Sequence, residues 1–187
     1  EIPDGTKLSD IQQKQITSYL NNKSIIDKNG VKEFIDTIKY PISYFDFETF
    51  QDAVPRFDNQ RPYMQMPFQF SLHFQNEPLG RLEHFELIVD HKFDPRKEIA
   101  EKMLEWIPPK GTIIAYHKSF EMGCIKKLAR YNVELSDQLL ALNERFTDLK
   151  DPFSKGYYYH PAFNGSLSIK AVLPALCPND DSLNYNS

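Results

Sequence analysis

The sequence has few cysteines and no long apolar segment. Its 187 residues include two cysteines, Cys124 and Cys177, which form neither a CxxC pair nor a disulfide framework. No apolar run approaches the roughly 18 residues that a membrane-spanning helix needs, and no signal-peptide pattern is present. We therefore expect a protein of a reducing compartment, the cytoplasm, with no membrane segment.

An excess of positive charge is also absent. The chain has 22 lysine and arginine residues against 26 aspartate and glutamate residues, a formal net charge of −4. This balance argues against a protein that coats nucleic acid through bulk electrostatics, but not against an enzyme that meets phosphates through metal ions in one cleft. The composition, 41% hydrophobic and 13% aromatic, is enough for one substantial core.

The chain predicts one α/β domain behind a helical extension. Residues 1–40 contain two short amphipathic segments separated by turns, which predict a helical connector packed against the main domain. Residues 41–187 follow an α/β order with one mixed sheet and flanking helices, in which three antiparallel strands precede the parallel ones. The expected strands are 42–50, 68–74, 82–89, 112–115 and 146–149, and the expected helices are 95–107, 119–131 and 136–145.

The rest of the chain predicts little regular structure. Residues 150–165 read as a long loop whose tyrosines, Tyr157–Tyr159, either stack on nucleic-acid bases or fold onto the core. A short helix broken by Pro174 is expected over 168–176, and the remainder is polar. Because the chain begins at Glu1 and not at methionine, we expect an excised fragment of a longer protein.

Two carboxylates lie within the first expected strand. Side chains alternate along a strand, so Asp46 and Glu48 share one face with Tyr44. Their Cα atoms are roughly 6.5–7 Å apart, close enough for both carboxylates to hold one cation or an adjacent pair. Two neighbouring carboxylates withdrawn from water need a counter-charge, so the pair predicts a divalent metal site. The alternative is that both acids end a strand at the surface.

A third carboxylate follows the fourth strand. On the helix expected over 119–131, Glu121 falls at helical spacing with apolar residues and so faces the sheet. Those apolar residues are Cys124, Ile125 and Leu128. An inward carboxylate suggests a site, whereas an acid in the first turn of a surface helix is ordinary. His117 precedes this helix and either contacts substrate or starts the helix.

Other polar residues give weaker signals. Lys126, Lys127 and Arg130 form either a solvated helix face or a face that meets a phosphate backbone. The five histidines lack the spacing of a structural zinc site. Asp148, at the end of the last expected strand, is interpreted as structural.

The motif residues resemble a known superfamily. Asp46-Phe47-Glu48-Thr49 resembles the D-x-E-T first motif of the DnaQ-like (DEDD) 3′–5′ exonucleases, which have a ribonuclease H-like fold. Ala115–Glu121 resembles their second motif, with Glu121 where aspartate is usual and His117 where asparagine is usual. Together with segments 67–71 and 166–174, these motifs make the chain similar to an uncharacterised bacterial domain family. That family is predicted to be nuclease-like and is often attached behind a PD-(D/E)xK-type nuclease domain. The resemblance covers roughly residues 40–176.

This resemblance implies a two-metal phosphodiesterase acting on DNA or RNA. Two Mg²⁺ or Mn²⁺ ions would clamp the scissile phosphate, activate a water and stabilise the leaving oxygen. Asp46 would bridge the ions, Glu48 would hold the water-activating ion and Glu121 the other. The implied substrate contacts are Thr49, Phe50 and His117.

The superfamily has a fourth acid on a C-terminal helix, which this chain lacks. Asp180 and Asp181 lie in a polar tail without a helical pattern, so we expect the chain to stop before that helix, bind metal weakly and have little activity. One alternative is a catalytically inactive ribonuclease H-like module that binds nucleic acid or protein. A metal-free acid–base hydrolase is disfavoured, because Asp46 and Glu48 point the same way and do not flank a bond.

Overall fold

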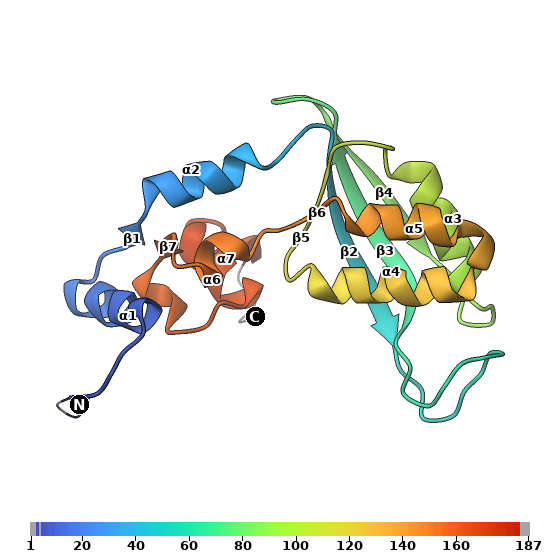
Figure 1. The fold of residues 1–187 in the computed structure, drawn as a ribbon, viewed down its shortest axis with the longest axis horizontal. Coiled ribbons are helices and arrows are strands. Elements are labelled where there is room, and N and C mark those ends of the chain that lie inside the picture. The colour runs from blue at the N-terminus through green and yellow to red at the C-terminus, as the bar shows by residue number, and fades with distance from the viewer. Residues whose placement is uncertain (1–2, 4, 184–187) are drawn as a thin grey trace. The chain divides into compact units, whose positions relative to one another are not determined.

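The chain folds into two compact units (Figure 1). The computed structural model describes residue 3 and residues 5–183. One unit spans residues 38–149, and the other combines residues 1–37 with residues 150–187. Residues 150–187, which the order of elements assigns to the main domain, therefore group with the N-terminal segment. The last four residues of that expected domain lie outside the described part.

A five-stranded mixed sheet forms the unit of residues 38–149. The strands lie in the order β4-β3-β2-β5-β6. Their bounds are Ile42–Phe50 for β2, Met66–Gln75 for β3, Leu82–Ile88 for β4, Thr112–Ala115 for β5 and Phe146–Asp148 for β6. β2 pairs antiparallel with β3 and β3 with β4, whereas β2, β5 and β6 run parallel. The expected antiparallel strands followed by parallel ones are confirmed.

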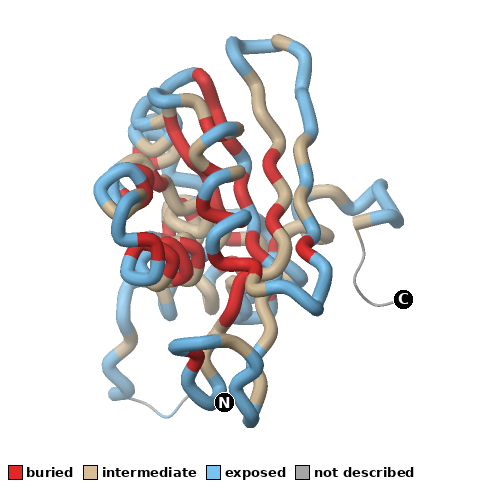
Figure 2. Tube along the Cα trace, turned by 90° about the vertical axis from the view of Figure 1, so that its right-hand side faces the viewer, coloured by how far each residue is buried: buried red, intermediate tan, exposed pale blue. Residues whose placement is uncertain are grey.

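Three helices cover one face of this sheet (Figure 1). They are α3, Arg96–Trp106; α4, Ser119–Tyr131; and α5, Ser136–Asn143, which a short 3₁₀ turn, Val133–Leu135, joins to α4. Their apolar stripes pack onto alternate strand residues such as Phe45 and Phe47, which are 3% and 4% exposed. Figure 2 shows buried residues concentrated along these strands and helices. The period-2 and helical patterns of the sequence thus meet in one core.

Within this unit, the side chains on the opposite face of β2 are the more exposed ones. Residues paired directly across β2 and β3 share a face, so Tyr44, Asp46 and Glu48 lie with His73, Ser71 and Gln69. Asp46 and Glu48 are both exposed. The expected grouping of the two carboxylates on one face is confirmed, but neither residue is buried, and Asp46 is only partly withdrawn from water.

The second unit is small and mostly helical. Its elements are α1, Asp10–Asn21; β1, Ile25–Ile26; α2, Lys28–Asp36; α6, Asp151–Ser154; β7, Tyr158–Tyr159; α7, Ile169–Leu176; and 3₁₀ turns at Pro161–Phe163 and Asp181–Leu183. α1 begins at a capping box, in which the Ser9 hydroxyl accepts from the backbone N–H of Gln12 and the Gln12 side chain accepts from the N–H of Ser9. The expected α1 is confirmed.

The expected loop of residues 150–165 is only partly correct. It contains α6 and also β7, which pairs antiparallel with β1. Tyr159 is buried against Phe163 and Val172 in a core that belongs to this unit. Pro174 lies inside α7 and does not end it. In both units, no helix among the described residues is long and apolar enough to cross a membrane.

Candidate functional site

Acidic side chains from three elements gather at the carboxyl ends of the parallel strands. Asp46 and Glu48 lie on β2, Asp148 is the last residue of β6, and Glu121 lies in the first turn of α4, which follows β5. The carboxyl ends of parallel strands are where open α/β sheets bind ligands. The charges of Asp46 and Asp148 both act on Glu121 and raise its pKa. These three carboxylates therefore share one electrostatic environment.

Glu121 is the most unusual of these acids. Its residue is 3% exposed, and its Oε2 atom has no hydrogen-bond partner among the described residues. Burial raises its pKa to about 7; a hydrogen bond with its own backbone N–H opposes this rise, and the charges of Asp46 and Asp148 add smaller increases. Its expected place on the inward stripe of α4 is confirmed. A buried carboxylate surrounded by like charges calls for a proton or a cation.

Asp46 and Glu48 form the exposed part of the group. The pKa of Asp46 is raised, first by partial withdrawal from water and then by the charge of Glu48, while a hydrogen bond with the backbone of Phe47 acts in the opposite direction. Two like charges on one strand face repel each other at this separation. The pair thus favours any cation that reaches the exposed face of β2.

Asp148 orders the start of α4. Its two carboxylate oxygens accept hydrogen bonds from the backbone N–H groups of His117 and Lys118, at 2.8 and 3.1 Å. His117 has a left-handed backbone, with φ of 70°, a conformation that a non-glycine residue keeps only when its surroundings hold it there. The expected structural part for Asp148 is supported, but it also adds charge beside Glu121. Asp148 ends a parallel strand, and this position in the sequence is the signal that could have placed it with the other acids.

The expected substrate contacts lie close by in the fold. Thr49 and Phe50 end β2 just past a β-bulge between Glu48 and Thr49; bulges often redirect side chains beside sites. The guanidinium carbon of Arg56 lies over the Phe50 ring, 4.5 Å from the centroid of that ring. His117 is exposed at the turn before α4. All three therefore stand at the same edge of the sheet as the acids.

The geometry suits a hydrated cation better than a fully enclosed one. Within the described residues, no three histidine, cysteine, aspartate or glutamate side chains form a ready-made metal cage. Mg²⁺ does not need one, because it is usually held by one or two carboxylates while water and substrate phosphate oxygens complete its coordination. The unpartnered oxygen of Glu121 and the repelling charge of Asp46 fit such an ion.

Residues 43–168 match the family model described as a domain of unknown function, DUF2779. The chain belongs to this family. The match includes every expected site residue of the DUF2779 chain, namely Asp46, Glu48, Thr49, Phe50, His117 and Glu121, together with Asp148. The site and the family match thus fall on the same part of the sequence.

Two curated relatives resemble the DUF2779 chain over most of its length. "Uncharacterized protein UU173" of Ureaplasma parvum serovar 3 (strain ATCC 700970) is 29% identical over 173 residues, which cover 84% of this chain and 24% of that protein. "Uncharacterized protein MG366 homolog" of Mycoplasma pneumoniae (strain ATCC 29342 / M129 / Subtype 1) is 26% identical over 173 residues, with 86% and 26% covered. The chain therefore spans about a quarter of the length of these relatives. No solved structure matches it.

Proposed function

We propose that the DUF2779 chain carries a metal-dependent nuclease domain that cleaves phosphodiester bonds of DNA or RNA by a two-metal mechanism. The observation that carries the proposal is Glu121, a buried carboxylate with an unpartnered oxygen and a pKa raised to about 7 beside Asp46 and Asp148. Such a group would serve as a ligand for a cation. Cleavage from the 3′ end, as in the DnaQ-like exonucleases, is the form that the D-x-E-T motif favours.

The sheet supports a ribonuclease H-like assignment within this proposal. An antiparallel meander, β4-β3-β2, continues through β5 and β6 in parallel, and β2, which carries Asp46 and Glu48, is the central strand. Because β2, β5 and β6 run parallel, the carboxyl end of β2 lies beside the loops that follow β5 and β6. The loop after β5 leads directly to Glu121.

The acids have two different parts in the proposed chemistry. Asp46, Glu48 and Glu121 would hold the metal ions, as the motif resemblance suggests. When bound, Mg²⁺ or Mn²⁺ lowers the pKa of a coordinated water and offsets the charge that develops on the phosphate. Asp148 fixes the turn of His117 and thereby the position of Glu121. Protons compete with the cation for Asp46 and Glu121, so metal affinity rises with pH.

The proposal extends to the context of the chain. The chain covers 24% and 26% of its curated relatives, which leaves room for an attached PD-(D/E)xK-type nuclease domain in a longer protein. Both domains of such a protein would then bind nucleic acid. The cytoplasm of a bacterial cell is the corresponding location.

A second candidate is a catalytically inactive ribonuclease H-like module that binds nucleic acid or a protein. The observation that favours it is that the described acids do not assemble into a complete three-ligand metal cage. Glu121 in place of the usual aspartate points the same way. In such a module, Glu121 would simply remain protonated up to about neutral pH.

Manganese titration separates the two candidates. We expect calorimetry on the chain at about pH 8 to show weak, saturable Mn²⁺ binding that Asp46→Asn weakens at least tenfold, because the charge of Asp46 interacts with those of Glu48 and Glu121. Glu83→Gln, which removes an exposed carboxylate on β4, is the matched control and should leave binding unchanged. Release of nucleotides from 3′-labelled DNA and RNA in Mn²⁺ then reports cleavage. Binding that Asp46→Asn leaves intact would contradict the metal site.

A further inference from the structure

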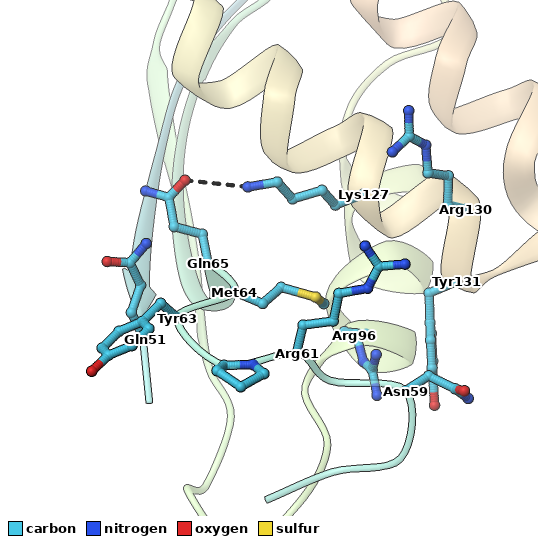
Figure 3. A pocket seen from close by; sticks show the side chains of 11 residues that line it. Gln51, Asn59, Arg61, Tyr63, Met64, Gln65, Arg96, Lys127, Arg130 and Tyr131 are labelled. Carbon is cyan, nitrogen blue, oxygen red and sulfur yellow. Dashed lines mark hydrogen bonds between the residues drawn. The ribbon is translucent and has the colours of Figure 1, made fainter. Parts of the chain in front are cut away.

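A cavity of about 460 Å³ lies beside the C-terminal half of α4 (Figure 3). Side chains of α4, with Arg96 of α3, line one side, and the end of β2 and the loop before β3 line the other. The lining residues are Gln51, Asn59, Arg61, Pro62, Tyr63, Met64, Gln65, Arg96, Lys127, Arg130 and Tyr131. A cavity of this size lies within the range of small-ligand sites, roughly 300–1,000 Å³.

Three cations around the cavity are available to an anion. Arg61, Lys127 and Arg130 form no ion pair with a carboxylate anywhere in the described chain. Lys127 instead donates to the side-chain oxygen of Gln65 at 3.3 Å, a contact drawn in Figure 3. Three unneutralised cations around one cavity favour an anionic ligand.

Arg96 differs from these three cations. It is 2% exposed, and its guanidinium donates to Asp94 and to the backbone carbonyl of Asp58. The same guanidinium lies 3.5 Å from the ring centroid of Tyr131. Arg96 is thus a neutralised, fixed part of the wall and holds the Tyr131 ring in place.

An aromatic side chain stands at the opposite side of the cavity. Tyr63 is 67% exposed and keeps a left-handed backbone, with φ of 56°. Its backbone N–H donates to the carbonyl of Asp52 at 2.7 Å, which holds the turn. An exposed aromatic ring on a held, strained turn is typical of a residue kept for binding. Nucleic-acid bases stack on such rings without sequence preference.

One helix connects this cavity to the acidic group. Glu121, Lys127 and Arg130 all belong to α4, but at 3.6 residues per turn Lys127 and Arg130 point about 120° and 180° away from Glu121 around the helix axis. At 1.5 Å per residue, Lys127 and Arg130 lie about 9 and 13.5 Å along the axis from Glu121. A stacked single strand advances about 3.4 Å per nucleotide, so the separation corresponds to roughly three or four stacked nucleotides.

We propose that this cavity holds one nucleotide of a single-stranded nucleic acid, whose phosphate meets Arg61, Lys127 and Arg130 and whose base stacks on Tyr63. This inference rests on the proposed function, since it assigns the path of the substrate strand away from the acids. Phosphate contacts position a strand without reading its sequence. The cavity would therefore set the affinity for the substrate strand and the distance from the strand end at which it is bound.

Fluorescence anisotropy with a 5′-labelled oligothymidylate tests the inference in EDTA, so that no metal site takes part. We expect Lys127→Gln combined with Arg130→Gln to weaken binding about tenfold or more. The salt dependence should become shallower by roughly 0.7 for each phosphate that the variant no longer neutralises. Tyr63→Leu should weaken binding about tenfold without changing that slope, because a stacked base carries no charge. dTMP should compete more strongly than inorganic phosphate.

The control is Lys126→Gln, which removes one exposed charge from the same helix outside the cavity. It should change affinity less than twofold. An equally large effect of Lys126→Gln, equal competition by polyglutamate, or no saturable binding at low salt would each overturn the inference. Retained strand binding with no Mn²⁺ binding overturns only the proposed nuclease. Mn²⁺ binding without strand binding overturns only this cavity assignment. Circular dichroism checks that each variant folds, and Arg61→Gln replaces the double variant if it does not.

Discussion

Replacing Glu121 by glutamine should make the metal-free protein more stable at high pH and leave it almost unchanged at low pH. The pKa of Glu121 is raised from its ordinary value of 4.5 to about 7, so the folded state binds a proton more tightly than the unfolded state. Between about pH 4.5 and 7 the folded chain therefore holds more protons, and its stability falls as the pH rises. Glutamine is neutral throughout and does not show this decrease.

The size of the effect follows from the pKa. A tenfold change in proton affinity corresponds to about 1.4 kcal/mol, so a rise from 4.5 to about 7 corresponds to about 3 kcal/mol in the unfolding free energy above pH 7. Screening by solvent reduces this free energy only slightly, since Glu121 is 3% exposed. At pH 4 both side chains are neutral and both leave a buried polar atom without a partner, which brings the two proteins to similar stability.

Urea unfolding in EDTA at about pH 4, 6 and 8.5 measures the difference. Glu121→Gln should gain about 3 kcal/mol over the natural chain at pH 8.5, progressively less toward pH 4, and addition of Mn²⁺ at pH 8.5 should narrow the gap by stabilising only the natural chain. Glu83→Gln reports the effect of removing an exposed carboxylate. A difference that does not vary with pH would refute the reasoning.

Two further substitutions test the frame of the site. Asp148→Asn should cost about 1–2 kcal/mol in urea unfolding, because the amide NH2 group, which cannot accept a hydrogen bond, replaces one of the two oxygens that accept from the N–H groups of His117 and Lys118. Asp137→Asn, which changes an exposed acid on α5, is its control. Gly111→Ala should cost at least about 3 kcal/mol, since Gly111 has φ of 89° and a Cβ would lie 2.0 Å from the Pro41 carbonyl oxygen. Gly123→Ala, whose Cβ would meet nothing within 4 Å, should instead stabilise the helix by about 0.5–1 kcal/mol; equal costs at both glycines would contradict the steric argument.

The sequence predicts the sheet well because its signals are local. Residues 42–50 are rich in β-branched and aromatic side chains, and the structure places β2 there with Phe45 and Phe47 inside. The inward position of Glu121 likewise follows from the spacing of the apolar residues on one helix. Both signals lie within about ten consecutive residues and depend on no distant contact.

Other features depend on contacts that a local pattern does not contain. β7 forms because Tyr158 and Tyr159 pair with Ile26 and Ile25, more than a hundred residues earlier in the chain. No local pattern contains this pairing, and the sequence of residues 150–165 therefore predicts a loop. The exposure of Asp46 depends on whether anything covers the second face of the sheet, and the alternation in β2 is the same in either case. Asp148 joins the acids through the parallel pairing of β5 with β6, a contact between segments more than thirty residues apart, although its place at the end of an expected strand already hinted at this.

The charge distribution along α4 is the strongest argument that the acids and the cavity belong together. An acid at the start of a helix and bases at its end are favourable for the helix dipole alone, with no ligand involved. The dipole does not explain why Glu121 is buried with an unpartnered oxygen, since an acid interacts favourably with a helix dipole while it remains exposed to solvent. Nor does it explain Arg61, which the loop before β3 brings to the same cavity. A chain with net charge −4 therefore separates its charges locally, which is the distribution that the proposed phosphodiesterase would use, with a cation at the scissile phosphate and fixed bases on the phosphates beyond it.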